Sequence, residues 1–262
     1  MEINPLVVAG VAAVFGLLMG SFATVAAHRI PRRESFLVGR SKCPSCGHVI
    51  TAKENIPLLS FALQRGRCRH CGARISWRYP ATEVVTAALF TFAVLRFGAS
   101  FEALVYAGLF WVLVVLAVID LEHRLLPNRV VYPAFVVGWV ALALAAWAED
   151  SPERLADAAL GAAIFGGLLF LVAFIYPAGM GGGDVKLAFV LGTFLGYAGG
   201  IGVTLVGMFL SFLLGGLIGV VVLIATRGDR KYALPFGPFL AGGSVIAIVT
   251  GLPLLRAYLE AF

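Results

Sequence analysis

The chain has 262 residues, of which 60% are hydrophobic and 13% charged, and its mean hydropathy is +0.95. Ordinary soluble domains are about 45–50% apolar and about 25% charged, so this composition excludes that class. The net charge of +6 does not call for a nucleic-acid partner, since no recognition motif accompanies it and an anionic membrane surface attracts basic loops. Most of the apolar surface must face lipid.

Eight apolar stretches follow one another along the chain, and a bilayer-crossing helix needs about 20 such residues. They cover about Pro5–Ala27, Ala81–Leu95, Phe101–Ile119, Val130–Ala148, Leu155–Tyr176, Leu187–Ala198, Ile201–Ala225 and Phe239–Leu259. The sixth is short, but Leu187–Ala225 is long enough for two spans, with Gly199-Gly200 as the natural break. The sequence therefore predicts an all-α polytopic membrane protein with about eight transmembrane helices.

The first apolar stretch lacks the charge pattern of a cleaved signal peptide. Only Glu2 precedes it, whereas Arg29, Arg32 and Arg33 follow it. Secretory signals carry their basic residues in front of the apolar segment. We expect this stretch to remain as the first transmembrane helix.

The segment Arg29–Pro80 is the only large polar piece, and it holds all four cysteines. They form two knuckles, Cys43-Pro-Ser-Cys46-Gly and Cys68-Arg-His-Cys71-Gly, with twenty-one residues between them. Two C-x-x-C pairs at such a spacing are typical of a tetrahedral structural zinc site. The sequence therefore predicts a small zinc-binding loop domain whose ligands are Cys43, Cys46, Cys68 and Cys71.

Two other uses of the cysteines are less compatible with the sequence. Disulfides are disfavoured in a reducing cytoplasm, and a thioredoxin-like redox motif needs a flanking βαβ unit that this loop is too short to hold. His48 and His70 are spare candidate ligands, but four cysteines fill the site. Both histidines are therefore interpreted as bystanders.

Two aspartates lie at the ends of membrane-length apolar stretches. Asp120 follows the third stretch, and Asp184 closes the run Gly181-Gly182-Gly183-Asp184. An ionisable group at the edge of a hydrocarbon span is costly and by default marks a functional site. The remaining aspartates lie in polar turns or charged runs and are interpreted as solvated surface residues: Asp150, Asp157 and Asp229.

The positive charges give an orientation. If every stretch crosses the membrane once, 17 of the 20 Lys and Arg residues lie on the same side as Arg29–Pro80. The other side has only Arg96, Arg154 and Arg256. By the positive-inside rule, the cysteine loop, Asp120 and Asp184 are cytoplasmic and both termini are outside.

Two carboxylates that meet can share one proton and hydrolyse a peptide bond, as in aspartic proteases. The ionised carboxylate takes a proton from water, and the protonated one polarises the scissile carbonyl. No metal is needed at such a site. We expect Asp120 and Asp184 to be the catalytic pair, because His28 and His123 are isolated and there is no H-E-x-x-H motif.

The chain resembles bacterial type IV prepilin peptidases over nearly its whole length. The motifs that carry the resemblance are Gly20-Ser21-Phe22, His28-Arg29-Ile30-Pro31, the two cysteine knuckles, Asn55-Ile56-Pro57-Leu58-Leu59-Ser60, Arg78-Tyr79-Pro80, Glu83, Ile119-Asp120-Leu121, Leu126-Pro127-Asn128, Gly179-Met180-Gly181-Gly182-Gly183-Asp184-Val185-Lys186-Leu187 and Pro235-Phe236-Gly237-Pro238. Gly-x-Gly-Asp also marks the wider class of intramembrane aspartyl proteases. In the resembled family, the two catalytic aspartates match Asp120 and Asp184.

The resemblance implies a two-step enzyme of type IV pilus and type II secretion systems in the bacterial inner membrane. Such an enzyme cuts the basic leader from a prepilin or pseudopilin, before its hydrophobic stem, and then methylates the new N-terminal amine with S-adenosylmethionine. No glycine-rich motif for that cofactor is present, so its binding residues are unknown. The expected domains are the first helix (1–28), a cytoplasmic four-cysteine zinc-binding domain (29–80) and a seven-helix aspartyl peptidase domain (81–262).

Three alternatives remain open at this point. The enzyme could be a peptidase without methyltransferase activity. A proton-coupled transporter would also explain membrane-edge acids, but it leaves the zinc module unexplained, and the chain has no two-half repeat. A non-enzymatic zinc-bearing scaffold leaves Gly-Gly-Gly-Asp unexplained.

Overall fold

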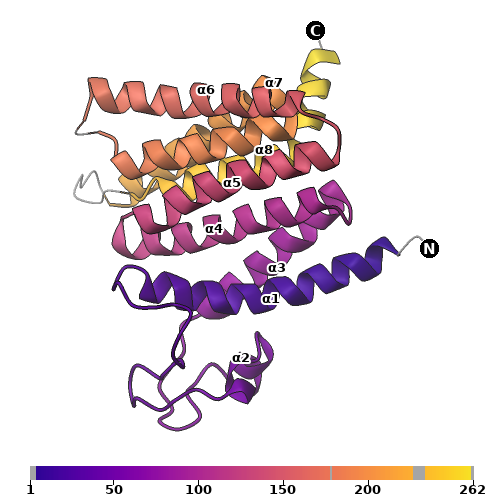
Figure 1. The fold of residues 1–262 in the computed structure, drawn as a ribbon. Coiled ribbons are helices and arrows are strands. Elements are labelled where there is room, and N and C mark those ends of the chain that lie inside the picture. The colour runs from indigo at the N-terminus through magenta and orange to yellow at the C-terminus, as the bar shows by residue number, and fades with distance from the viewer. Residues whose placement is uncertain (1–3, 178, 227–233, 261–262) are drawn as a thin grey trace. The chain divides into compact units, whose positions relative to one another are not determined.

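The computed structural model describes residues 4–177, 179–226 and 234–260 (Figure 1), and in this part of the chain the regular structure is helical. The elements are α1 (Pro5–Arg29), the 3-10 helix η1 (Ala52–Asn55), α2 (Leu59–Leu63), α3 (Arg78–Phe97), α4 (Phe101–His123), α5 (Asn128–Ala148), α6 (Glu153–Ile175), α7 (Gly182–Ala225) and α8 (Gly237–Glu260). No strand occurs in the described residues; two isolated antiparallel bridges do, Lys42 with Val49 and Arg67 with Arg74. The predicted all-α class is confirmed.

Six helices in the described ranges, α1 and α3 to α7, are long and apolar enough to cross a membrane. Of these, α7 spans 44 residues, and Gly199 and Gly200 inside it have non-helical backbone angles. A straight helix would hold Leu195 and Gly207 about 18 Å apart, but a Cβ added to Gly207 would lie 2.7 Å from Leu195 Cδ1. The chain therefore doubles back at the two glycines. The two halves of α7 and the 24-residue α8 give the eight helices expected from the sequence.

The helices extend beyond the apolar stretches that predicted them. Helix α4 continues past Ile119 to His123, and α7 begins at Gly182 rather than at Leu187. Backbone hydrogen bonds can continue where side chains turn polar, so hydropathy alone marks the apolar part and not the helix end. As a result, Asp120 lies in the last turn of α4 and Asp184 in the first turn of α7, rather than in connecting loops.

Two compact units make up the chain, Met1–Val118 and Ile119–Phe262. In the first unit, α1 packs closely against α3. A Cβ added to Gly16 would lie 2.6 Å from Ala87 Cα, and one added to Gly20 would lie 2.6 Å from Glu83 Cα. Small residues four apart thus let two helix backbones approach, which is the usual packing device inside membranes. Trp111 extends the same packing by donating from Nε1 to the Met19 carbonyl at 2.9 Å.

A buried carboxylate ties the polar loop of the first unit to α3. Glu83 is 8% exposed, and its Oε2 accepts a hydrogen bond from the Leu58 amide at 2.8 Å. Leu58 has a φ of +57°, a strained conformation for a residue with a branched side chain. The hydrogen bond to Glu83 holds the chain in that conformation where it enters α2.

In the second unit, α7 is the central element, because α5, α6 and α8 all pack against it. The α6 contact is made backbone to backbone, since Cβ atoms on Gly161 or Gly192 would overlap the other helix. On the α8 side, Ser211 Oγ donates to the Leu240 carbonyl at 3.2 Å. These close contacts hold both halves of α7 against their neighbouring helices within the unit.

Candidate functional site

The two aspartates singled out by the sequence lie in the same pocket of the second unit. Its volume is about 360 Å³, and its lining joins the end of α4, the turn that follows it and the start of α7. The lining residues are Asp120, Arg124, Leu125, Leu126, Asn128, Gly181, Gly182, Gly183, Asp184 and Lys186. Asp120 and Asp184, which are 64 positions apart in the sequence, therefore line one cavity.

Asp120 is held from a third helix. Its side chain is 5% exposed, and its Oδ2 accepts a hydrogen bond from the Gly237 amide at 3.0 Å. Gly237 is the first residue of α8, so its N–H has no partner inside the helix and is free to bind a carboxylate. A Cβ on Gly237 would lie 2.7 Å from the same Oδ2. Glycine at this position therefore makes room for the carboxylate that its amide binds.

Asp184 occupies the first turn of α7, with Gly181 as the N-cap residue. The N-terminal end of a helix interacts favourably with a negative charge. A Cβ on Gly181 would lie 2.9 Å from Asp184 Oδ2, and one on Gly183 would lie 3.0 Å from Leu126 Cβ. Two of the three glycines before Asp184 are thus explained by close contacts. Gly182 has open space around it.

Lys186 also lines the pocket, where it contacts groups other than the two carboxylates. Lys186 Nζ donates to Asn128 Oδ1 at 3.0 Å, and it lies 5.3 Å from the ring centre of Tyr132. The lysine is therefore held by α5, the helix that begins at Asn128. Both carboxylates are left facing the cavity, which is the arrangement that general acid–base catalysis on a bound peptide needs.

The remaining aspartates do not join this pocket. Asp157 differs from the expected solvated surface residue: it is half-buried, and a Cβ on Gly200 would lie 3.7 Å from its Oδ2. It packs at the turn where α7 doubles back. Asp150 lies after α5 in a left-handed conformation, with a φ of +50°. Asp229, with the charged run Arg227–Lys231 that contains it, lies outside the described residues.

The four cysteines lie together in the first unit, in two turns with matching hydrogen bonds. In one, the Cys43 amide donates to the His48 carbonyl at 2.9 Å; in the other, the Cys68 amide donates to the Ala73 carbonyl at 2.8 Å. The glycines that follow the second cysteines, Gly47 and Gly72, have φ values of +70° and +69°. These left-handed glycines are what allow each knuckle to point two sulfurs the same way.

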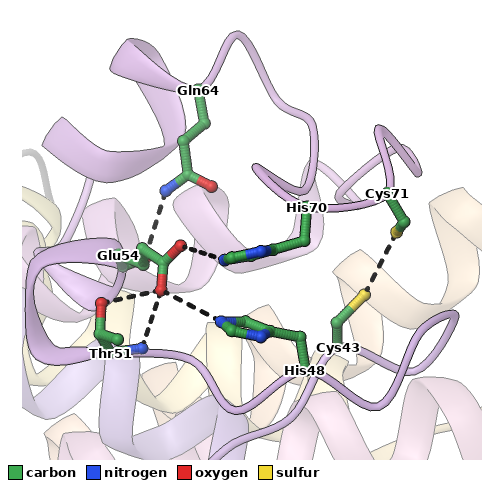
Figure 2. Close-up of polar contacts among 7 residues, drawn as sticks. All are labelled: Cys43, His48, Thr51, Glu54, Gln64, His70 and Cys71. Carbon is green, nitrogen blue, oxygen red and sulfur yellow. Dashed lines mark hydrogen bonds and ion pairs between the residues drawn. The ribbon is translucent and has the colours of Figure 1, made fainter.

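The sulfur positions match a tetrahedral ion. All four Sγ atoms lie within 4.8 Å of one another, and Cys43 Sγ is 3.9 Å from Cys71 Sγ (Figure 2). Four thiolates about 2.3 Å from a central zinc ion would be about 3.8 Å apart. The cysteines form no disulfide. The cluster can therefore hold a metal ion.

The thiols already differ before any ion binds. The backbone amides of Cys46 and Ser45 lower the pKa of Cys43 to about 6. At Cys71, the Ala73 amide favours the thiolate, but desolvation and the neighbouring thiols outweigh it and raise the pKa to about 11. Cys43 is therefore a thiolate near neutral pH, the form in which cysteine binds a metal.

Sequence reasoning missed two features. One is Gly237, which binds Asp120 from 117 positions away; the motif Pro235-Phe236-Gly237-Pro238 was the only signal for it. The other is a cluster of His48, Glu54 and His70, which we call the His–Glu cluster. The two histidines group apart from the four cysteines and have a carboxylate partner of their own.

Comparison with known proteins places the chain. The family model "Bacterial Peptidase A24 N-terminal domain" matches residues 14–97, and that of the "Type IV leader peptidase family" matches residues 107–224. No solved structure matches it at a significant level.

Three curated relatives carry the name prepilin leader peptidase/N-methyltransferase. The Bacillus subtilis protein is 39% identical over 94% of this chain and 96% of its own length. The Pseudomonas putida protein is 36% identical over 92% of this chain and 90% of its own length. The Pseudomonas aeruginosa protein is 34% identical over 94% of this chain and 92% of its own length. With two aspartates in one pocket and relatives of this similarity along almost its full length, the chain belongs to the type IV leader peptidase family.

Proposed function

We propose that this protein is a membrane-embedded aspartic endopeptidase that removes the leader from type IV prepilins or pseudopilins and then N-methylates the new N-terminus. The observation that carries the proposal is the meeting of Asp120 and Asp184 in one pocket. The names of the relatives support both activities. They give no support to the transporter alternative.

In the proposed cleavage step, the ionised carboxylate of the pair takes a proton from a water molecule as its oxygen attacks the scissile carbonyl. The protonated carboxylate hydrogen-bonds to that carbonyl and stabilises the tetrahedral intermediate. On collapse the C–N bond breaks and a proton passes to the leaving amine, which becomes the N-terminus of the mature pilin. The Gly237 amide holds the Asp120 carboxylate in position throughout.

The proposed substrate has a basic leader followed by a hydrophobic stem. A stem of this kind would stay in the lipid beside the helices, while the leader reaches the cysteine loop side. The segment 29–80 is itself basic, with 11 Lys or Arg against Glu34 and Glu54. It is therefore suited to anionic membrane lipids rather than to the leader charges, and the leader would have to be recognised by other contacts.

The proposed orientation places the cysteine loop and both aspartates on the cytoplasmic side, with both termini outside. The support is the distribution of 17 against three positive charges. A tag in the turn between α5 and α6, beside Asp150, should be labelled from outside intact cells. A tag in Arg227–Lys231 should be labelled only after the cells are opened. Labelling of the second tag in intact cells would contradict the orientation.

For the second activity we propose S-adenosylmethionine as methyl donor. The nitrogen of the new α-amine would attack the methyl carbon as the carbon–sulfur bond of the sulfonium breaks, S-adenosylhomocysteine would leave as the neutral thioether, and the nitrogen would lose a proton to become a secondary amine. The zinc loop, residues 29–80 with a structural zinc ion on the four cysteines, is the proposed support for this step. The cleavage step proposed above assigns no catalytic role to the residues of this loop.

One experiment tests both activities. The purified full-length protein is incubated with a leader-bearing prepilin, with and without S-adenosylmethionine, and the products are read by mass spectrometry. We expect leader loss in both samples and one added methyl group only in the presence of the donor. An uncut prepilin would overturn the peptidase. Cleavage without methylation would support the alternative of a peptidase alone.

A further inference from the structure

The His–Glu cluster lies beside Cys43 and Cys71 (Figure 2) and forms a group separate from the four cysteines. Its three side chains offer two imidazole nitrogens and a carboxylate oxygen, all within 4.8 Å of one another. The imidazole rings of His48 and His70 are stacked with their centres 3.4 Å apart. This stacking turns Nε2 of both rings toward the same carboxylate, that of Glu54.

The carboxylate is fixed in a way that leaves one oxygen for a ligand. Glu54 Oε2 accepts hydrogen bonds from the Thr51 amide at 3.0 Å and from Thr51 Oγ1 at 2.8 Å. Its other oxygen, Oε1, lies 3.4 Å from His70 Nε2. Only 9% of the Glu54 side chain is exposed. Metal-binding carboxylates are typically oriented in this way by outer hydrogen bonds.

One nitrogen of the cluster, His48 Nε2, is buried without a hydrogen-bond partner among the described residues. Glu54 Oε2 is 4.0 Å away, beyond hydrogen-bond reach. Two ligands about 2.05 Å from one ion are separated by about 3.3 Å in a tetrahedron and by about 4.1 Å when opposite each other. Glu54 Oε1 and His70 Nε2 are 3.4 Å apart, and one donor atom from each of the three residues lies within 4.8 Å of the others, so the three side chains can reach a single ion.

We propose that His48, Glu54 and His70 form a second metal site, for a divalent transition metal ion such as zinc. Two histidines and one carboxylate are a donor set that such ions prefer, and they leave a coordination position open for water or a substrate group.

The proposed site depends on the cysteine cluster. His48 closes one cysteine knuckle through its carbonyl, which accepts from the Cys43 amide, and His70 lies between Cys68 and Cys71. An ion on the cysteines draws the two knuckles together and so sets the two histidines side by side. The cysteine cluster should therefore bind its metal ion first, and the His–Glu cluster should bind an ion only after that.

The test uses the full-length protein in detergent, purified through a tag without histidines. It is saturated with zinc and freed of unbound metal. Zinc per protein is measured by mass spectrometry, and the ligands are identified by X-ray absorption at the zinc edge. We expect two equivalents in the unmodified protein, with scattering from sulfur at about 2.3 Å and from nitrogen or oxygen at about 2.0–2.2 Å.

The variants make the test specific. His48→Ala should keep one equivalent with sulfur ligands only, and the retained ion reports that the loop is still folded. Glu54→Gln should weaken the second equivalent by at least about tenfold, while Glu34→Gln, an exposed acid of the same segment, should keep both. Cys43→Ser should lose both. The proposed site would be overturned if the unmodified protein bound only one zinc ion, with sulfur ligands alone, or if His48→Ala still bound two zinc ions. The dependence of the second site on the cysteine cluster would be overturned if Cys43→Ser still bound one zinc ion through nitrogen or oxygen ligands.

Discussion

The zinc loop and the pocket of the two aspartates achieve fixed geometry by opposite means. Between residues 29 and 79 only Cys43 is buried, so the loop has no hydrophobic core. In the unit that holds the pocket, by contrast, α7 contributes fully packed side chains such as Leu187, Leu191 and Leu195, each at most 1% exposed. The proposed zinc ion would supply the folding free energy of the loop, about 10–16 kcal/mol for small zinc modules, whereas the unit that holds the pocket takes its folding free energy from helix packing. A substitution that unfolds the zinc loop should therefore leave the pocket of the two aspartates folded, and the converse should also hold.

The largest expected effect comes from the carboxylates. Asp120→Asn and Asp184→Asn should each reduce leader cleavage by about 10³-fold or more, because a carboxamide can serve neither as the general base nor as the general acid of the reaction. Zinc content and the amount of protein in the membrane should not change. Asp150→Asn, outside the pocket, is the matched control and should cleave normally. Near-normal turnover by either pocket variant would remove that aspartate from the mechanism.

A smaller loss of cleavage activity is expected when the Asp120 carboxylate is shifted but not removed. Gly237→Ala puts a Cβ 2.7 Å from Asp120 Oδ2, and a shift of about 1 Å can cost about 100-fold in rate. We expect a drop of about 10- to 100-fold in kcat with little change in thermal stability, since the atom that must move is a side-chain oxygen. Gly216→Ala, with open space around it, serves for comparison. If Gly237→Ala lowered thermal stability markedly along with kcat, Gly237 would matter for packing alone.

Breaking the loop should affect cleavage less. Cys43→Ser should release the zinc and unfold residues 29–80, with loss of N-methylation and a reduced but measurable rate of cleavage. Ser45→Ala keeps the backbone amide of the same knuckle and should retain metal and both activities. Metal content, cleavage and methylation are measured on one preparation. Full methylation by the zinc-free protein would contradict the proposed role of the loop, and complete loss of cleavage would show that the two regions do not fail independently.

The mildest perturbation is a change of pH. Because the Cys43 thiol has a pKa near 6 in the folded, metal-free loop, it is a thiolate above that pH and competes with protons below it. Zinc affinity should therefore fall more steeply as the pH drops through about 6. Competition with a chromophoric chelator across this range measures the effect. An affinity that is constant through this range would contradict the assignment of Cys43 as a ligand.

Much of this organisation could be predicted from the sequence, and the physical reason is that the signals are local. Membrane-length apolar runs, C-x-x-C pairs and a carboxylate at a span edge are each visible within a few residues. The contact between Gly237 and Asp120 is not, because it depends on how helices far apart in sequence pack. Nor is the His–Glu cluster, since Glu54 lies in η1 between the knuckles and only the folded loop turns it toward the histidines.

The reversal inside α7 has a consequence for how the protein enters the membrane. The two halves are joined by Gly199 and Gly200 alone, and no Lys or Arg occurs between Leu187 and Ala225. A first half that entered by itself would have neither a polar connector nor a charge to stop it at the far surface. We therefore expect the insertion machinery to release the two halves into lipid together, as a preformed helical hairpin. The substitution Gly199→Arg should then hinder the biogenesis of the whole protein rather than the enzyme's turnover.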